Sequence, residues 1–124
     1  MKKLFLDDIR IPKDAIGLVP SNLNQFYFEN DWVIVRDFHQ FCNYLQKFGV
    51  PDFVSFDHDL ADEHYGYFTT DNWVEKTGYE CAKWLVDFCL EKGVSLPGYQ
   101  VHSANPVGKK NIESYLLNAK KHLL

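Results

Sequence analysis

The feature that most constrains the fold is an alternation of short apolar runs with segments of helical periodicity. The apolar runs occupy residues 4–8, 32–36, 53–56 and 99–104, and a helical pattern follows each of the last three. Continuous apolar runs of this length suit parallel strands that are buried on both faces, and intervening helices suit right-handed crossovers. We therefore predict a three-layer α/β fold, in which a parallel sheet of about four strands carries helices on both faces.

Local signals mark where two of the helices begin. Asp37, with Gln40 three residues later, resembles a capping box, and apolar residues at helical spacing continue from there to Gly49. Thr77 and Glu80 have the same spacing and predict a second capping box, ahead of another apolar stripe. These signals place both helices between predicted strands, as the crossovers require.

Length and composition indicate one core. The chain has 124 residues, of which 46% are apolar, so we expect a single domain over residues 1–124. Residues 12–31 contain proline and glycine with little periodicity, which predicts an irregular connection with only one or two turns of helix. The three cysteines form no CxxC pair and are expected to be reduced, buried thiols, which favours a cytoplasmic location.

Charge and hydropathy exclude some partners. The formal net charge of -4 gives no global field that attracts nucleic acid backbones, so we expect no binding to double-stranded DNA. The apolar run at the N-terminus is too short, and too soon acidic, for a signal peptide or a membrane span, and we expect no membrane association. Lysines 109, 110, 120 and 121 make the last helix the one basic region, although a solvated helix face explains most of them.

Polar side chains gather where the predicted strands end. They are Asp7 and Asp8 after the first strand, Asp57, His58 and Asp59 after the third, and His102 and Ser103 after the fourth. In open parallel sheets, ligands bind beyond the carboxyl ends of strands, where the strand order reverses. Neighbouring carboxylates stay ionised together only around a cation, and Mg²⁺ prefers oxygen ligands and bridges to phosphate. We predict a Mg²⁺ site at Asp7, Asp8 and Asp57; the alternative is that the acid pair only ends a strand.

Other polar residues are candidates for contacts with a phosphate group. Asn105 to Lys109 open the last helix, so backbone N–H groups and a lysine can approach an anion together. Ser103 can donate to a phosphate oxygen, and Arg10 places a guanidinium near the same rim. His58 could reach the crevice from a loop. Ordinary turn geometry and surface ion pairs are the alternatives for these residues.

For catalysis, Asp57 or Asp59 is a candidate to orient or activate a nucleophile, and His102 is a candidate to move a proton. A hydrogen-bonded structural imidazole is the alternative for His102. Surface roles are expected for the remaining histidines, which are His39, His64 and His122. Within residues 61–76, aromatic side chains either pack over the pocket or stack on a base, namely Tyr65, Tyr67, Phe68 and Trp73.

Three segments resemble a known family. They read LDDIRIP at residues 6–12, SFDHDL at residues 55–60 and VHSANPVG at residues 101–108. In this order they look like the cyclic-phosphate-processing receiver-like family, within the broader receiver or flavodoxin-like fold of response regulators. The resemblance spans nearly the whole chain, apart from residues 13–31 and 61–76.

The resemblance implies roles for several of these residues. Asp7 and Asp8 are expected to bind the metal, Asp57 to occupy the position that is phosphorylated in signalling receivers, and Ser103 to replace the receiver hydroxyl residue. Receivers also have a fifth strand that ends in a lysine, whereas this chain stops after the fourth strand and its helix. Either Lys109 replaces that lysine from another position, or the acceptor chemistry is lost.

Three functions remain open at this point. The first is a Mg²⁺-dependent phosphoesterase for a cyclic nucleotide or an RNA 3′-end phosphate, which the family resemblance implies. The second is a signalling or nucleotide-binding module without turnover. The third is a phosphatase of the haloacid-dehalogenase type, which the Asp57-His58-Asp59 sequence resembles and in which Asp57 and Asp59 would share one metal away from Asp7.

Overall fold

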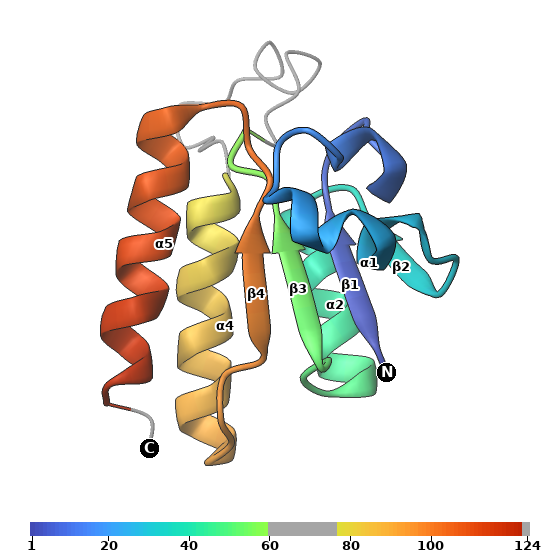
Figure 1. The fold of residues 1–124 in the computed structure, drawn as a ribbon. Helices are drawn as coiled ribbons and strands as arrows, with labels where there is room; N and C mark the ends of the chain where they lie inside the picture. The colour runs from blue at the N-terminus through green and yellow to red at the C-terminus, as the bar shows by residue number, and fades with distance from the viewer. Residues whose placement is uncertain (60–76, 123–124) are drawn as a thin grey trace, which may run out of the picture.

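The computed structural model describes residues 1–59 and 77–122. In these ranges four parallel strands form one sheet in the order β2-β1-β3-β4, as Figure 1 shows. The strands are β1 (Lys3–Leu6), β2 (Trp32–Val35), β3 (Phe53–Phe56) and β4 (Gly98–Val101). The predicted parallel α/β sheet is confirmed, but β1 and β4 end before the polar residues that the predicted runs included. Those polar residues therefore lie in the loops beyond the strands.

The helices cover both faces of the sheet. Helices α2 (Phe38–Phe48), α4 (Gly78–Lys92) and α5 (Pro106–Lys120) pack on one face, where their apolar stripes meet strand residues such as Leu4 and Phe56. The other face carries the short helix α1 (Asn24–Phe28) and two 3₁₀ turns, Pro12–Ala15 and Ser21–Leu23, which pack around Phe5 and Tyr27. The irregular connection predicted for residues 12–31 is therefore confirmed.

This distribution of helices follows from the handedness of the crossovers. From β1 the chain moves to one neighbour, β2, and from β2 it crosses over β1 to β3 and on to β4. Right-handed connections in opposite directions lie on opposite faces of a sheet. The strand order therefore reverses between β1 and β3, and a crevice is expected beyond the carboxyl ends of these two strands.

Only the first of the two predicted capping boxes supplies a side-chain cap, and its Gln40 side chain accepts from the Arg36 N–H at 2.7 Å, one residue before the N-cap. The Asp37 side chain accepts a hydrogen bond of 2.8 Å from the Gln40 N–H and caps α2. Thr77 stands at the N-cap of α4, but its side chain makes no capping hydrogen bond. Instead the Gly78 N–H donates to the His58 carbonyl oxygen at 2.7 Å. The first turn of α4 is thus tied to the loop after β3.

Buried groups elsewhere are structural. The three cysteines lie buried in α2 and α4, and burial raises the pKa of the Cys89 thiol to about 11, as expected for an unreactive thiol. Lys3 is fully buried in β1, where its ammonium pairs with Glu29 and Asp31 and lies over the Phe26 ring. In the described ranges no helix is both long and apolar enough to cross a membrane.

Candidate functional site

Three carboxylates meet at the reversal of the strand order. Asp7 and Asp8 follow β1, Asp57 follows β3, and each offers an oxygen atom within 4.8 Å of the others. The sheet hydrogen bonds continue into two of these residues, since the Asp7 N–H donates to Val35 and the Asp57 N–H donates to Leu6. Asp7 and Asp57 are buried, and Asp8 is half-buried. The topology therefore brings the three predicted metal ligands together; we call them the carboxylate cluster.

Asp7 is held by donors on both of its oxygens. Its Oδ1 accepts from the N–H groups of Ile9 and Arg10 at 3.0 and 2.8 Å, and its Oδ2 accepts from His102 Nε2 at 3.0 Å and from the Arg10 guanidinium at 3.3 Å. Burial alone would raise the pKa of Asp7. The hydrogen bonds from His102 and from the two backbone N–H groups outweigh it and hold the pKa below its ordinary value. Asp7 is therefore a permanent anion near neutral pH.

The pKa of Asp57 is shifted in the opposite direction. Burial, reinforced by the negative charge of Asp7, raises the pKa of Asp57 to about 7. The Arg10 guanidinium offsets part of this effect from 3.8 Å, while Asp8 adds to it. The carboxylate cluster thus carries more negative charge than its surroundings neutralise.

Two arginines shape the loop after β1. Arg10, predicted as a phosphate contact, lies between Asp7 and Asp57 and keeps its side chain 30% exposed, so it can also reach a ligand. Arg36, which sequence reasoning did not single out, donates from its guanidinium to the backbone oxygens of Asp7 and Arg10 at 3.3 and 2.6 Å. Arg36 therefore braces the loop that carries the acid pair.

His102 lies beside the carboxylate cluster and is fully buried. Its Nε2 faces Asp7, its Nδ1 lies 2.6 Å from Ser55 Oγ, and its ring stacks on Phe5 with centroids 4.4 Å apart. Ser55 in turn lies 2.6 Å from the Tyr27 hydroxyl. Ser55 and Tyr27 were missed by sequence reasoning. The available signal was a serine two residues before Asp57, which strand alternation places on the same face.

The residues at the start of α5 form a separate group. The Asn105 side chain accepts from the Gly108 N–H at 3.0 Å and donates to Asp59 at 3.3 Å, while Ser103 Oγ accepts from the Asn105 N–H at 3.0 Å. The Ser103 hydroxyl hydrogen stays available for another acceptor. Lys109 lies in the first turn of α5, but it is not among the groups that shift the pKa of Asp57, which are Asp7, Arg10, Asp8 and the Asp59 N–H.

His58 and Asp59 join this second group and not the carboxylate cluster. His58 Nδ1 lies 2.8 Å from Asp59 Oδ1, and the Asp59 side chain is 61% exposed. The His58 ring packs against Gly108 so closely that a Cβ there would lie 2.3 Å from the ring. The predicted site residues therefore occupy two neighbouring sets, a buried one around Asp7 and Asp57 and an outer one around Asp59.

Some predicted features lie outside the described residues. His64 and the aromatic side chains of residues 61–76 belong to the range that the structure does not describe. The surface role expected for His64 and the place over the pocket expected for the aromatic side chains therefore stay predictions.

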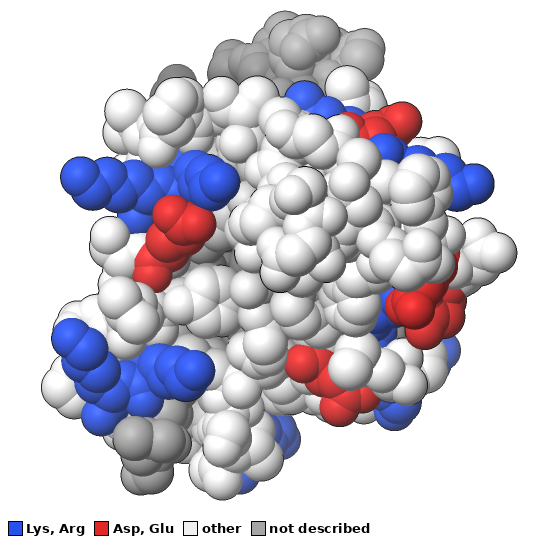
Figure 2. Space-filling view, viewed as in Figure 1, with Lys and Arg blue, Asp and Glu red and all other residues white. Residues whose placement is uncertain are grey.

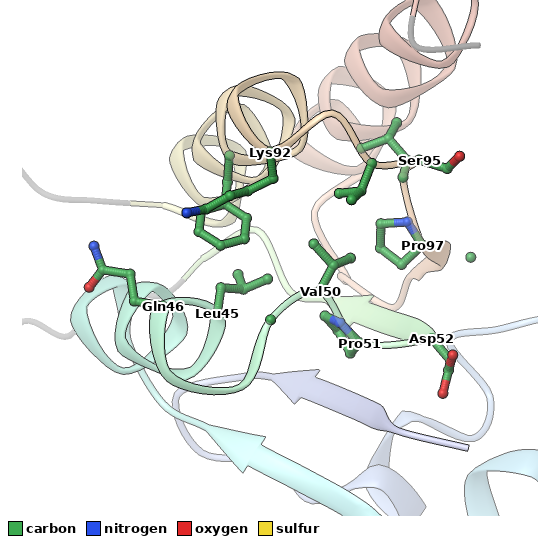
Figure 3. Close-up of a pocket in the computed structure, with 13 residues that line it drawn as sticks. Leu45, Gln46, Val50, Pro51, Asp52, Lys92, Ser95 and Pro97 are labelled. Atoms are coloured by element: carbon green, nitrogen blue, oxygen red, sulfur yellow. The ribbon is translucent and has the colours of Figure 1, made fainter.

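A cavity of about 550 Å³ lies at the other end of the sheet, away from the carboxylate cluster. Figure 3 shows it between the end of α2 and the turn after α4, with Val50, Pro51 and Pro97 along one side and Lys92 across it. Its walls are mainly apolar, and Asp52 and Lys92 supply its charged side chains. We do not assign the candidate site to it, because it lacks a group of clustered acids.

The carboxylate cluster fits a hard divalent cation. All three donors are carboxylate oxygens, which Mg²⁺ prefers, and one or two protein carboxylates together with waters usually suffice to hold it. The raised pKa of Asp57 is a second sign of fit, because a cation between the acids would offset both the burial of its charge and the repulsion from Asp7 that raise this pKa.

Comparisons with known proteins bear on the family and the fold. The family model of the cyclic-phosphate processing receiver domain matches residues 2–118. One similar solved structure, described as a yeast Spc42 trimeric coiled-coil segment, amino acids 181–211, fused to another structure, aligns over 91% of this chain at 16% identity and a TM-score of 0.50. The match covers 61% of that chain, and at this identity it shows the fold alone. No curated protein matches the sequence.

Proposed function

Because the chain belongs to the cyclic-phosphate processing receiver family, we propose that it is a Mg²⁺-dependent phosphoesterase for a cyclic phosphate, carried by a nucleotide or an RNA 3′ end. The observation that carries the proposal is the meeting of Asp7, Asp8 and Asp57 within 4.8 Å at the reversal of the strand order. This is where open parallel sheets bind ligands, and it is a donor set that suits a phosphate-bridging cation.

In this proposal the buried set holds the metal. Asp7, Asp8 and Asp57 bind Mg²⁺, which when bound polarises the phosphoryl oxygens. Arg10 reaches from the same rim, where its guanidinium can pair with a phosphate oxygen. His102 is fully buried, so we assign it to holding Asp7 and not to transferring a proton to the ligand.

The outer set handles the phosphate and the proton. Asp59 orients the His58 imidazole through the 2.8 Å contact, and in the proposal this partly exposed pair takes a proton from an attacking water. Ser103 can donate its hydroxyl hydrogen to a phosphate oxygen. The N–H groups at the start of α5 and the Lys109 ammonium add positive potential on that side.

The test is turnover of a 2′,3′-cyclic nucleotide, followed by chromatography, with Mg²⁺ and with a chelator. We expect turnover with Mg²⁺ only, and Asp57→Asn should abolish it. Asp52→Asn is the matched control, because Asp52 lines the cavity at the opposite end of the sheet and should leave turnover unchanged. No turnover of cyclic or linear phosphate substrates at any Mg²⁺ concentration would refute the proposal.

A phosphate-accepting signalling module is the second candidate, favoured by the position of Asp57 after β3 and next to an acid pair. It predicts an adduct on Asp57 after incubation with acetyl phosphate and Mg²⁺, seen by mass spectrometry and removed by hydroxylamine. Turnover without an adduct separates the phosphoesterase from this module.

The haloacid-dehalogenase reading loses support. It requires Asp57 and Asp59 to share a metal with Asp7 remote, whereas Asp7 lies in the carboxylate cluster and the exposed Asp59 contacts His58 and Asn105.

A further inference from the structure

Four buried polar side chains form a continuous chain of hydrogen bonds from the α1 face of the sheet to the carboxylate cluster. Tyr27 of α1 contacts Ser55 of β3, Ser55 contacts His102 after β4, and His102 contacts Asp7 after β1. The distances are 2.6, 2.6 and 3.0 Å, and all four residues have no exposed surface. Buried hydrogen-bonded chains of this kind are costly to break, because a polar group left buried without its partner bears the full cost of its desolvation.

The direction of every hydrogen bond in this chain follows from its last member. A carboxylate only accepts hydrogen bonds, so His102 Nε2 must carry the proton that faces Asp7. A neutral imidazole with a proton on Nε2 has a lone pair on Nδ1, so Ser55 must donate its hydroxyl hydrogen to Nδ1. The Ser55 oxygen can then accept only from the Tyr27 hydroxyl.

Other arrangements leave a buried group without a partner. With the proton on Nδ1 alone, the Nε2 lone pair would face the Asp7 carboxylate. With both ring nitrogens protonated, Ser55 would donate to Tyr27, whose own hydrogen would then have no acceptor among the contacts of the described residues. Burial raises the pKa of Tyr27 to about 12, so its phenol keeps the hydrogen that it donates to Ser55.

The stack of His102 on Phe5 also fixes the orientation of the imidazole ring. The two rings are nearly parallel, at 5°, and Phe5 is fully buried, so the imidazole plane cannot turn without displacing the core. With the plane held by Phe5, the tautomer set by Asp7 and Nδ1 occupied by the Ser55 hydroxyl, the Nε2–H has one direction, toward Asp7 Oδ2.

We propose that Tyr27 and Ser55 are positioning residues for the carboxylate cluster, which satisfy Nδ1 of His102, hold its ring in place and through it orient the Asp7 carboxylate for Mg²⁺. The inference rests on the proposed Mg²⁺ site. It extends that site to two residues that lie in the core and touch neither the metal nor the ligand. Groups that hold a metal ligand in place commonly change metal affinity by 10- to 100-fold when they are removed.

The test combines two measurements on the full chain. Nitrogen-15 NMR of the histidine side chains reports the tautomer of His102 in the metal-free protein, and calorimetric titration with Mg²⁺ alone reports affinity. We expect the wild type to show the Nε2–H tautomer with a hydrogen-bonded Nδ1, and Ser55→Ala to show the nitrogen shift of an Nδ1 that has lost this hydrogen bond, together with about tenfold weaker Mg²⁺ binding. Tyr27→Phe, which keeps the ring and the Ser55 donor, should weaken binding less than Ser55→Ala.

Val19→Ala is the control. Val19 is buried on the α1 face, so its truncation should destabilise the same core, but Val19 does not belong to the chain of hydrogen bonds. It should leave both the tautomer and the Mg²⁺ affinity unchanged. If Ser55→Ala fails to fold, Tyr27→Phe carries the comparison. An Nδ1–H tautomer in the wild type, or wild-type affinity in the folded variants, would overturn the positioning role alone. A wild type that does not bind Mg²⁺ would overturn the proposed function and this inference together.

Discussion

At the scale of single residues, Asp57 is a side chain whose charge is unfavourable in the folded protein. Its pKa of about 7 lies well above the ordinary value of 3.8, so the folded chain keeps this proton to a higher pH than the unfolded chain. Stability is therefore lost as the pH rises from about 4 through 7. One pKa unit corresponds to about 1.4 kcal/mol, which sets an upper limit of about 4 kcal/mol on the loss.

The first prediction follows from this loss of stability with rising pH. Without metal, the free energy of unfolding of the wild type should fall between pH 4 and pH 8 relative to that of Asp57→Asn, and the variant should be the more stable at pH 8. Urea denaturation in a chelator buffer at several pH values measures both. The comparison with the variant removes the contributions of other titrating groups. Parallel curves for the two proteins would contradict the raised pKa.

The second prediction concerns Gly108. A Cβ at this position would lie 2.3 Å from the His58 ring, so Gly108→Ala must displace His58 from Asp59. We expect a loss of about 1–3 kcal/mol by overpacking, despite the better helix propensity of alanine. The control is Asn111→Ala at an exposed site of α5, which should be neutral or slightly stabilising in the same thermal denaturation. Equal stability of the two variants would show that His58 does not pack as described.

The approach of candidate site residues could be predicted from sequence where topology alone decides the geometry. Asp7, Asp8 and Asp57 follow neighbouring parallel strands, so their approach needs only the strand order. Tyr27 could not be placed, because it lies in an irregular segment whose packing against β3 depends on tertiary contacts. The burial of Lys3 could not be predicted either, because lysine is rarely buried unless it is paired with acids, here Glu29 and Asp31.

At the scale of elements, two helix N-termini make a matched pair. Asn105 caps α5 by accepting from the Gly108 N–H, and Asp37 caps α2 by accepting from the Gln40 N–H. Only the first cap also touches the outer set of site residues, because Asn105 donates to Asp59 as well.

The third prediction uses this pair. Asn105→Ala and Asp37→Ala should each lower stability by about 1 kcal/mol, as is usual for the loss of a side-chain cap. Turnover of a cyclic nucleotide should fall only in Asn105→Ala, in which Asp59 loses its hydrogen bond from the Asn105 side chain. If both variants lose turnover in proportion to their stability, the α5 cap has no specific role in the site.

The periodicity that predicts the helices does not predict how they begin. The Thr77–Glu80 spacing matches a capping box, yet α4 starts with Gly78 pressed against the Asp57 carbonyl, where a Cβ would lie only 1.8 Å from the oxygen. This approach takes the Gly78 N–H to His58 and explains why glycine stands there. Close packing between a helix and a distant loop leaves no periodic signal in the sequence.

At the scale of the whole molecule, the carboxylate cluster and the largely apolar cavity lie at opposite ends of the sheet. The acids gather beyond the carboxyl ends of β1 and β3, while the apolar cavity lies at the opposite ends of the strands (Figures 1 and 3). Figure 2 shows basic and acidic side chains interspersed around a largely uncharged area on the face it displays. On that face the charged side chains form no continuous basic track.

The central claim is tested most directly by titrating the isotope-labelled protein with Mg²⁺ and following its backbone amide NMR signals. We predict saturable shifts centred on Asp7, Asp8 and Asp57 and on the adjoining loops, with unchanged signals around Val50 and Pro97 at the opposite cavity, and no such shifts in Asp57→Asn. Absence of shifts at the carboxylate cluster in the wild type, or an identical response in Asp57→Asn, would contradict the account.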